Sequence, residues 1–139
     1  MTLAESIHQI LSRNDLVTDL FYLTYFERYP DIQTHFDGVD MEQQAVLLKM
    51  ALTTIQQYYD HDYPAAEQYL LVLGHKHHLR RIPQDLYADW RDCMLDTLER
   101  YFEHMWSEDL EDQWTEAINN AIDVMCRGYR EFPLNGDKS

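Results

Sequence analysis

Three histidines, His75, His77 and His78, lie close together near the middle of the chain, and Tyr87 follows His77 by ten residues. Imidazole is a common protein ligand of transition metals, and the ring is largely neutral at physiological pH. A histidine that points into a core is therefore a candidate metal ligand. The first question is which of the three histidines, if any, binds a metal.

The spacing of the histidines argues against a site built from several of them. Ligands on one helix face lie three or four residues apart, whereas His77 is two residues from His75 and one from His78, so it shares a face with neither. A multi-histidine zinc or di-iron site is therefore disfavoured. Only His77 keeps the helical phase of Leu70 and Leu73, which favours an inward orientation. Periodicity alone leaves open the alternative that all three are solvated residues at a helix end.

The chain is acidic, and this limits its partners. Its 139 residues include 11 Lys and Arg against 25 Asp and Glu, which gives a formal net charge of −14. Such a surface repels phosphate backbones and anionic membranes, so neither nucleic acid nor a membrane is an expected partner. The length predicts one domain over residues 1–139. Lys76, Arg80 and Arg81 form a local basic patch beside the histidines, which fits either a bound anion or a solvated helix end.

The sequence contains no uncharged apolar run of the roughly 18 residues that a membrane span needs. Its first residues lack the basic start and apolar run of a signal peptide. Cys93 and Cys126 fall on predicted apolar helix faces, so no disulfide framework is indicated. These features predict a cytoplasmic protein.

The pattern of apolar residues predicts an all-α fold of about six to seven helices. Only four glycines and four prolines interrupt the chain, and no segment alternates with a period of two. Asn14 and Asp15 are the expected cap of the second helix, Asp40 caps a long one, and Pro64 and Pro83 begin two others. The expected helices cover residues 3–12, 14–28, 30–36, 40–59, 64 to the histidine cluster, 83–105, and a last one from 108.

Aromatic residues and one amide are the other candidates for chemistry. Phe26 and Phe36 follow Tyr22 at spacings that are more typical of a plain core than of a cofactor pocket. Tyr22 differs because a buried phenol needs a hydrogen-bond partner or a polar ligand. Gln44 shares a helix face with Leu48, so its amide is either solvated or directed into a pocket.

In this order and at these spacings, a set of residues resembles the globin family, particularly bacterial single-domain globins and the globin domain of flavohaemoglobins. The residues that carry the resemblance are Leu20, Phe21, Tyr22, Phe26, Pro30, Phe36, Asp40, Met41, Glu42, Gln43, Gln44, Leu48, Leu73, Gly74, His77, Ile82, Tyr87 and Trp114. The resemblance implies a globin-like fold around a pocket for haem b.

The resemblance also implies a role for each site residue. His77 corresponds to the proximal ligand of the haem iron, Leu73 and Ile82 pack on the same haem face, and Tyr87 lies near His77. On the other face, Tyr22, Gln44 and Leu48 surround the gas, with the phenol and the amide as hydrogen-bond donors. The remaining haem contact is Phe36. Lys76, Arg80, Arg81 or His78 are the candidates to pair with the haem propionates.

The sequence departs from the family pattern in several places. Arg81 stands where the family usually has glycine, which predicts an altered corner after the proximal helix. Tyr129 falls near the position of a glutamate that completes a proximal network in flavohaemoglobins. The first helix is short by about six residues, and the sequence given ends at Ser139 without flavin or nicotinamide domains.

The function that the resemblance implies is reversible binding of a diatomic gas: dioxygen, nitric oxide or carbon monoxide. Nitric oxide dioxygenation or a peroxidase-like reaction is an alternative that needs an external reductase. A haem-based sensor or a haem-free globin-like interaction module is a further one. The many carboxylates on the last two helices favour a monomer or a weak homodimer.

Overall fold

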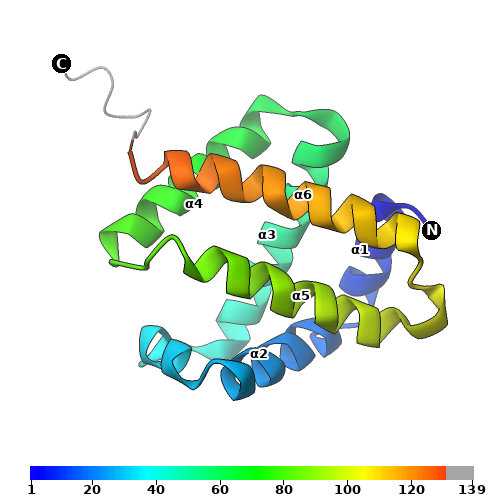
Figure 1. Cartoon of the computed structure of the whole chain (residues 1–139), viewed down its shortest axis with the longest axis horizontal. Coiled ribbons are helices and arrows are strands. Elements are labelled where there is room, and N and C mark those ends of the chain that lie inside the picture. The colour runs from blue at the N-terminus through cyan, green and yellow to red at the C-terminus, as the bar shows by residue number, and fades with distance from the viewer. Residues whose placement is uncertain (131–139) are drawn as a thin grey trace.

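The computed structural model describes residues 1–130, which form six α-helices and two short 3-10 helices (Figure 1). In chain order these are α1 (Leu3–Ser12), α2 (Leu16–Arg28), η1 (Pro30–Phe36), α3 (Met41–His61), α4 (Pro64–Leu79), α5 (Leu86–Phe102), η2 (Glu103–Met105) and α6 (Glu108–Arg127). The predicted all-α fold is confirmed. No helix among these residues is long and apolar enough to cross a membrane.

Polar side chains begin several of the helices, as the sequence predicts for α3. The Asp40 carboxylate accepts a hydrogen bond from the backbone N–H of Glu42 at 3.0 Å. Thr2 forms a capping box with Glu5 at the start of α1, and Ser107 caps α6. Each cap satisfies an N–H group that has no partner inside its own helix.

The predicted cap of α2 is wrong. Asp15 stands at the N-cap position, but its side chain forms no cap hydrogen bond. Its carboxylate instead forms an ion pair of 2.6 Å with Lys49 on α3. Asn14 adopts a left-handed backbone conformation with φ of 57°. A tertiary contact has therefore replaced the local one.

The predicted bounds of α5 and α3 also need correction. Pro83 begins a turn in which the N–H of Leu86 donates to its carbonyl, and the α-helix starts only at Leu86. At the other end Glu103 has φ of 52°, which terminates the α-helix before Met105. Met105 is 41% exposed and lies outside the predicted apolar face. The helix α3 continues to His61, beyond the predicted end near residue 59.

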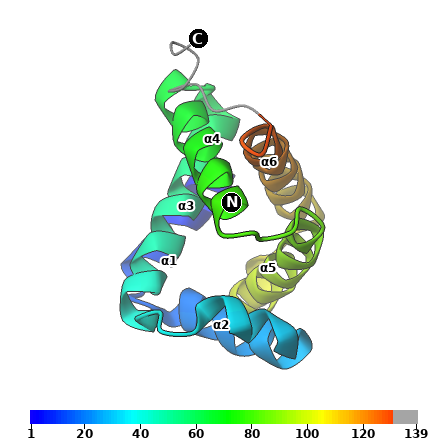
Figure 2. The same cartoon turned by 90° about the vertical axis from the view of Figure 1, so that its left-hand side faces the viewer.

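The helices surround a central opening that is visible in Figure 2. The antiparallel helices α5 and α6 form one side, α3 and α4 form another, and α2 crosses below. Away from the opening the core is closed by large side chains, including the fully buried Trp114, Phe21 and Phe102. The indole N–H of Trp114 donates to the Ser6 hydroxyl at 3.0 Å, which ties α6 to α1.

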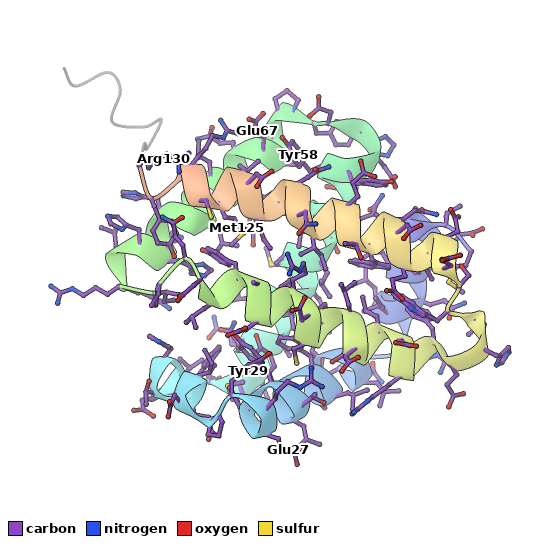
Figure 3. The ribbon with its side chains drawn as sticks, viewed as in Figure 1. Glu27, Tyr29, Tyr58, Glu67, Met125 and Arg130 are labelled. Carbon is purple, nitrogen blue, oxygen red and sulfur yellow. The ribbon has the colours of Figure 1, made fainter. Side chains whose placement is uncertain are left out.

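Two glycines allow α4 and α6 to cross with their backbones almost in contact. A Cβ atom on Gly74 would overlap the carbonyl oxygen of Met125, and one on Gly128 would overlap the carbonyl of Leu71. Both neighbours are backbone atoms, which cannot rotate away as a side chain can. An ion pair of 2.5 Å between Arg127 and Glu67 joins the same two helices; Glu67 is labelled on α4 in Figure 3.

Replacing Gly74 by alanine tests the crossing. Because the methyl group has no free space, α4 and α6 must separate, and Gly74→Ala should lower the free energy of unfolding of the apoprotein by about 1–3 kcal/mol or more. Chemical denaturation measures this loss. Leu79→Ala, at a 67% exposed position of the same helix, should change it by less than about 0.5 kcal/mol. Equal effects of the two substitutions would contradict the close crossing.

Candidate functional site

A cavity of about 780 Å³ lies between the helices, within the range of about 300–1,000 Å³ typical of small-molecule and cofactor sites. Side chains from α2, η1, α3, α4, α5 and α6 line it. Most of the lining is apolar; Met125 is the α6 contribution labelled in Figure 3. The polar exceptions are few, and they determine the chemistry available there.

His77 of α4 is partly buried and lines the cavity, and a hydrogen bond at Nδ1 orients its ring. Its Nδ1 lies 2.8 Å from the hydroxyl of Tyr87 on α5. That hydroxyl lies 3.3 Å from the hydroxyl of Tyr129, which donates to the carbonyl of Ile82 at 2.6 Å. Since Nδ1 is engaged, Nε2 is the ring nitrogen left for the cavity.

The surroundings keep these groups uncharged. Burial, together with the positive charge of Arg80, lowers the pKa of His77 to about 4, so the imidazole is neutral at pH 7. Burial also raises the pKa of Tyr87 and Tyr129 above the ordinary phenol value. A neutral imidazole with a held ring is the form that binds a metal ion.

A phenol from α2 and an amide from α3 meet at the cavity. The amide Nε2 of Gln44 donates to the Tyr22 hydroxyl oxygen at 3.0 Å, and both side chains line the cavity. Burial raises the pKa of Tyr22 to about 12, so the phenol keeps its proton at pH 7. The Phe36 ring packs edge-on against Tyr22 at 5.6 Å, Leu48 is 5% exposed, and His35, next to Phe36, also lines the cavity.

The other two histidines of the cluster point elsewhere. His75 Nδ1 lies 3.2 Å from the carbonyl oxygen of Gly128. The exposed His78 packs its ring against Tyr129, with the ring centroids 5.2 Å apart. Of the four basic candidates from the sequence, Lys76 and Arg80 line the cavity. Arg81 and His78 are absent from its lining.

Comparison with known proteins assigns this architecture to a family. The Globin family model matches residues 19–125, which include the whole cavity-bearing part of the fold from α2 to α6. The chain belongs to the globin family. A search of curated proteins finds no match to it. Globins bind haem and, through it, diatomic gases reversibly, and this is the general function of the protein.

The cavity of this globin fits the cofactor of its family. Its volume, its apolar lining and a neutral imidazole with Nε2 left for the cavity are what an axially bound haem requires. The structure brings together all the site residues that the sequence predicts, since each lines this one cavity: Tyr22, Phe36, Gln44, Leu48, Leu73, His77, Ile82 and Tyr87. Their individual roles toward haem stay predictions.

Sequence reasoning missed part of this globin's site. Tyr25, Ile32, Tyr69 and Trp90 also line the cavity. Ala51 and Ile55 of α3 do so as well; they continue the face of Leu48 at helical spacing, which was a usable signal. Tyr129 reaches the site through Tyr87. Its signal in the sequence was the family resemblance, which placed it near a proximal network, and no spacing rule predicts the contact.

The corner after α4 differs from the expectation that Arg81 alters it. Arg81 has φ of 61°, the left-handed conformation that glycine adopts without strain. The N–H of Ile82 still donates to the carbonyl of His77 at 3.0 Å. The globin therefore keeps a glycine-type corner with an arginine in it.

A glycine at this corner should stabilise the protein. Left-handed geometry costs an ordinary residue about 1–2 kcal/mol, whereas glycine adds a smaller entropic cost. Arg81→Gly should therefore raise the free energy of unfolding by about 0.5–1 kcal/mol in denaturant titrations. The neighbouring Arg80 has φ of −87°, so Arg80→Gly should lower it. A loss of stability in both variants would show that the corner is not strained.

Proposed function

We propose that this globin holds haem b in the cavity with His77 as the proximal iron ligand, and binds dioxygen or another diatomic gas reversibly on the side of Tyr22 and Gln44. The bound haem supplies the iron at which the gas binds. One observation carries the proposal: a single cavity is lined by a neutral, held imidazole from α4 and by a phenol–amide pair from α2 and α3.

His77 supports this role through its orientation and its charge state. Tyr87 engages Nδ1, so the ring cannot rotate freely and Nε2 is left for the iron. Because the pKa is about 4, no proton has to leave the ring before the metal binds at neutral pH. Leu73 and Ile82 line the same cavity and would hold the haem on the side of His77.

Tyr22 supports the role of hydrogen-bond donor to the gas. Its oxygen accepts the amide N–H of Gln44, so its own O–H proton is not used in that bond. Among the described residues the Tyr22 hydroxyl has no protein acceptor. The proton is therefore available to a ligand that develops negative charge, as dioxygen does at ferrous haem. Gln44 holds the phenol in place.

The basic residues at the cavity support the orientation of the cofactor. Lys76 and Arg80 lie one residue before and three residues after His77, and both line the cavity. We infer that they pair with the haem propionates, and that His78 and Arg81 do not. The set of Tyr22, Gln44 and Tyr87 also supports placing this chain with the bacterial single-domain globins and flavohaemoglobin globin domains that it resembles.

Removal of His77 tests the axial bond. His77→Gly should abolish the absorption spectrum of five-coordinate ferrous haem because the imidazole that would hold the iron is removed. Added imidazole should restore it, since the deletion leaves room for a free ring. His75→Ala, which alters a residue outside the cavity lining, should keep the wild-type spectrum. A wild-type spectrum in His77→Gly without imidazole would overturn the assignment.

Removal of the Tyr22 hydroxyl tests the donor. Loss of one hydrogen bond to a partly charged ligand costs about 1.5–3 kcal/mol, so Tyr22→Phe should release dioxygen about 10- to 100-fold faster in stopped-flow measurements. Release of carbon monoxide, a less polar ligand, should change much less. Tyr25 is a second cavity-lining phenol, and Tyr25→Phe should leave both rates within about twofold. Equal dioxygen rates in the two variants would contradict the donor role of Tyr22.

A further inference from the structure

A chain of three hydrogen bonds runs from the cavity to the backbone of the corner after α4. It begins at His77 Nδ1, passes through the hydroxyls of Tyr87 and Tyr129, and ends at the carbonyl oxygen of Ile82. The successive donor–acceptor distances are 2.8, 3.3 and 2.6 Å. Each hydroxyl has a single proton, so when all three contacts are hydrogen bonds the direction of each one is determined.

The direction of each hydrogen bond follows from the Ile82 end of the chain, because a carbonyl oxygen has no proton to donate. The Ile82 carbonyl can only accept, so the Tyr129 hydroxyl uses its one proton there. The oxygen of Tyr129 is then left as an acceptor, and Tyr87 donates to it. Once Tyr87 has used its proton, it can only accept from His77. The proton of the neutral His77 ring is therefore on Nδ1, and Nε2 carries a free lone pair.

We propose that Tyr129 is a positioning residue that selects the tautomer of His77, acting through Tyr87, so that the lone pair on Nε2 is directed to the cavity before any cofactor binds. The role of that lone pair toward iron rests on the proposed function. The tautomer itself is a property of the protein alone, and it can be measured in the apoprotein.

The position of Tyr129 connects the tautomer to the packing of α6. Tyr129 directly follows Gly128, the glycine at the crossing with α4. Its ring also packs edge-on against Tyr87, with centroids 6.1 Å apart. The end of α6 is thus held against both α4 and the corner, which keeps the hydroxyl within reach of Tyr87 and Ile82.

Loss of the Tyr129 hydroxyl should reverse the direction of the hydrogen bond between His77 Nδ1 and the Tyr87 hydroxyl. In Tyr129→Phe the proton of Tyr87 has lost its acceptor, and the nearest remaining one is His77 Nδ1. Tyr87 then donates to Nδ1, and the ring proton moves to Nε2. In that tautomer the nitrogen facing the cavity is a donor and has no lone pair for a metal.

The direct test is nitrogen-15 NMR of the apoprotein with labelled histidine at about pH 8, where ring proton–nitrogen couplings distinguish the two neutral tautomers. The wild type should show Nδ1–H at His77, with the signal assigned by its absence in His77→Gly. Tyr129→Phe should show a majority of Nε2–H, and Tyr101→Phe, at a tyrosine outside the cavity lining, should match the wild type. Nε2–H in the wild type, or Nδ1–H unchanged in Tyr129→Phe, would overturn the proposal.

A double substitution separates tautomer selection from a merely structural role. Tyr87→Phe combined with Tyr129→Phe removes the reversed donor as well, so His77 should return to a mixture of tautomers. The rate of haem loss should rise at least about tenfold in Tyr129→Phe and be slower in the double variant than in that single one. If Tyr129 only supports packing, the double variant will lose haem at least as fast, which would contradict the proposal.

Two results keep this test independent of the proposed function. If the apoprotein shows the expected tautomers but haem does not bind at His77, the proposed function fails and the tautomer selection stands. If haem binds at His77 but the tautomers do not respond to Tyr129, the proposed function stands and the tautomer selection fails.

Should Tyr129→Phe fail to fold, Tyr87→Phe alone provides the measurement, because it should convert pure Nδ1–H at His77 into a mixture of tautomers. Pure Nδ1–H in Tyr87→Phe would overturn the proposal.

Discussion

The crossing of α4 and α6 at Gly74 and Gly128 is the constraint on which the rest of the site depends. Backbone against backbone, the two helices have one possible separation, because any side chain larger than hydrogen would overlap a carbonyl oxygen. His77 follows Gly74 by three residues and Tyr129 follows Gly128 directly. The crossing therefore determines how far the imidazole reaches into the cavity and how close the second tyrosine comes to it.

The site combines an apolar enclosure with a few polar groups that are kept neutral. Burial moves the pKa of His77 down and those of Tyr22 and Tyr87 up, so in each case the uncharged form is favoured. A charge in this cavity without a partner would destabilise the fold. Hydrogen-bond directions, rather than charges, thus distinguish the imidazole end from the phenol end.

The sequence predicted the helices from local patterns, and the site residues from the ordered set of residues that carries the family resemblance. Helical phase favoured His77 among three histidines. The shared face of Gln44 and Leu48 left the amide either solvated or directed into a pocket, and in the structure Gln44 lines the cavity. Features that depend on tertiary packing were not predictable. The Asp15 carboxylate pairs with Lys49 instead of capping α2, and Tyr129, which follows α6, contacts the Tyr87 hydroxyl. Neither contact has a signal in local spacing.

The short link between α3 and α4 has a thermodynamic consequence. Only residues 62–63 separate the two helices, so they are joined at one end, while Gln44 and His77 lie toward their other ends. At 1.5 Å per residue these side chains stand roughly 20–27 Å from the link. A molecule held between them connects the parts of both helices that the link restrains least. Binding in the cavity and ordering of the ends of α3 and α4 that lie away from the link are therefore thermodynamically coupled.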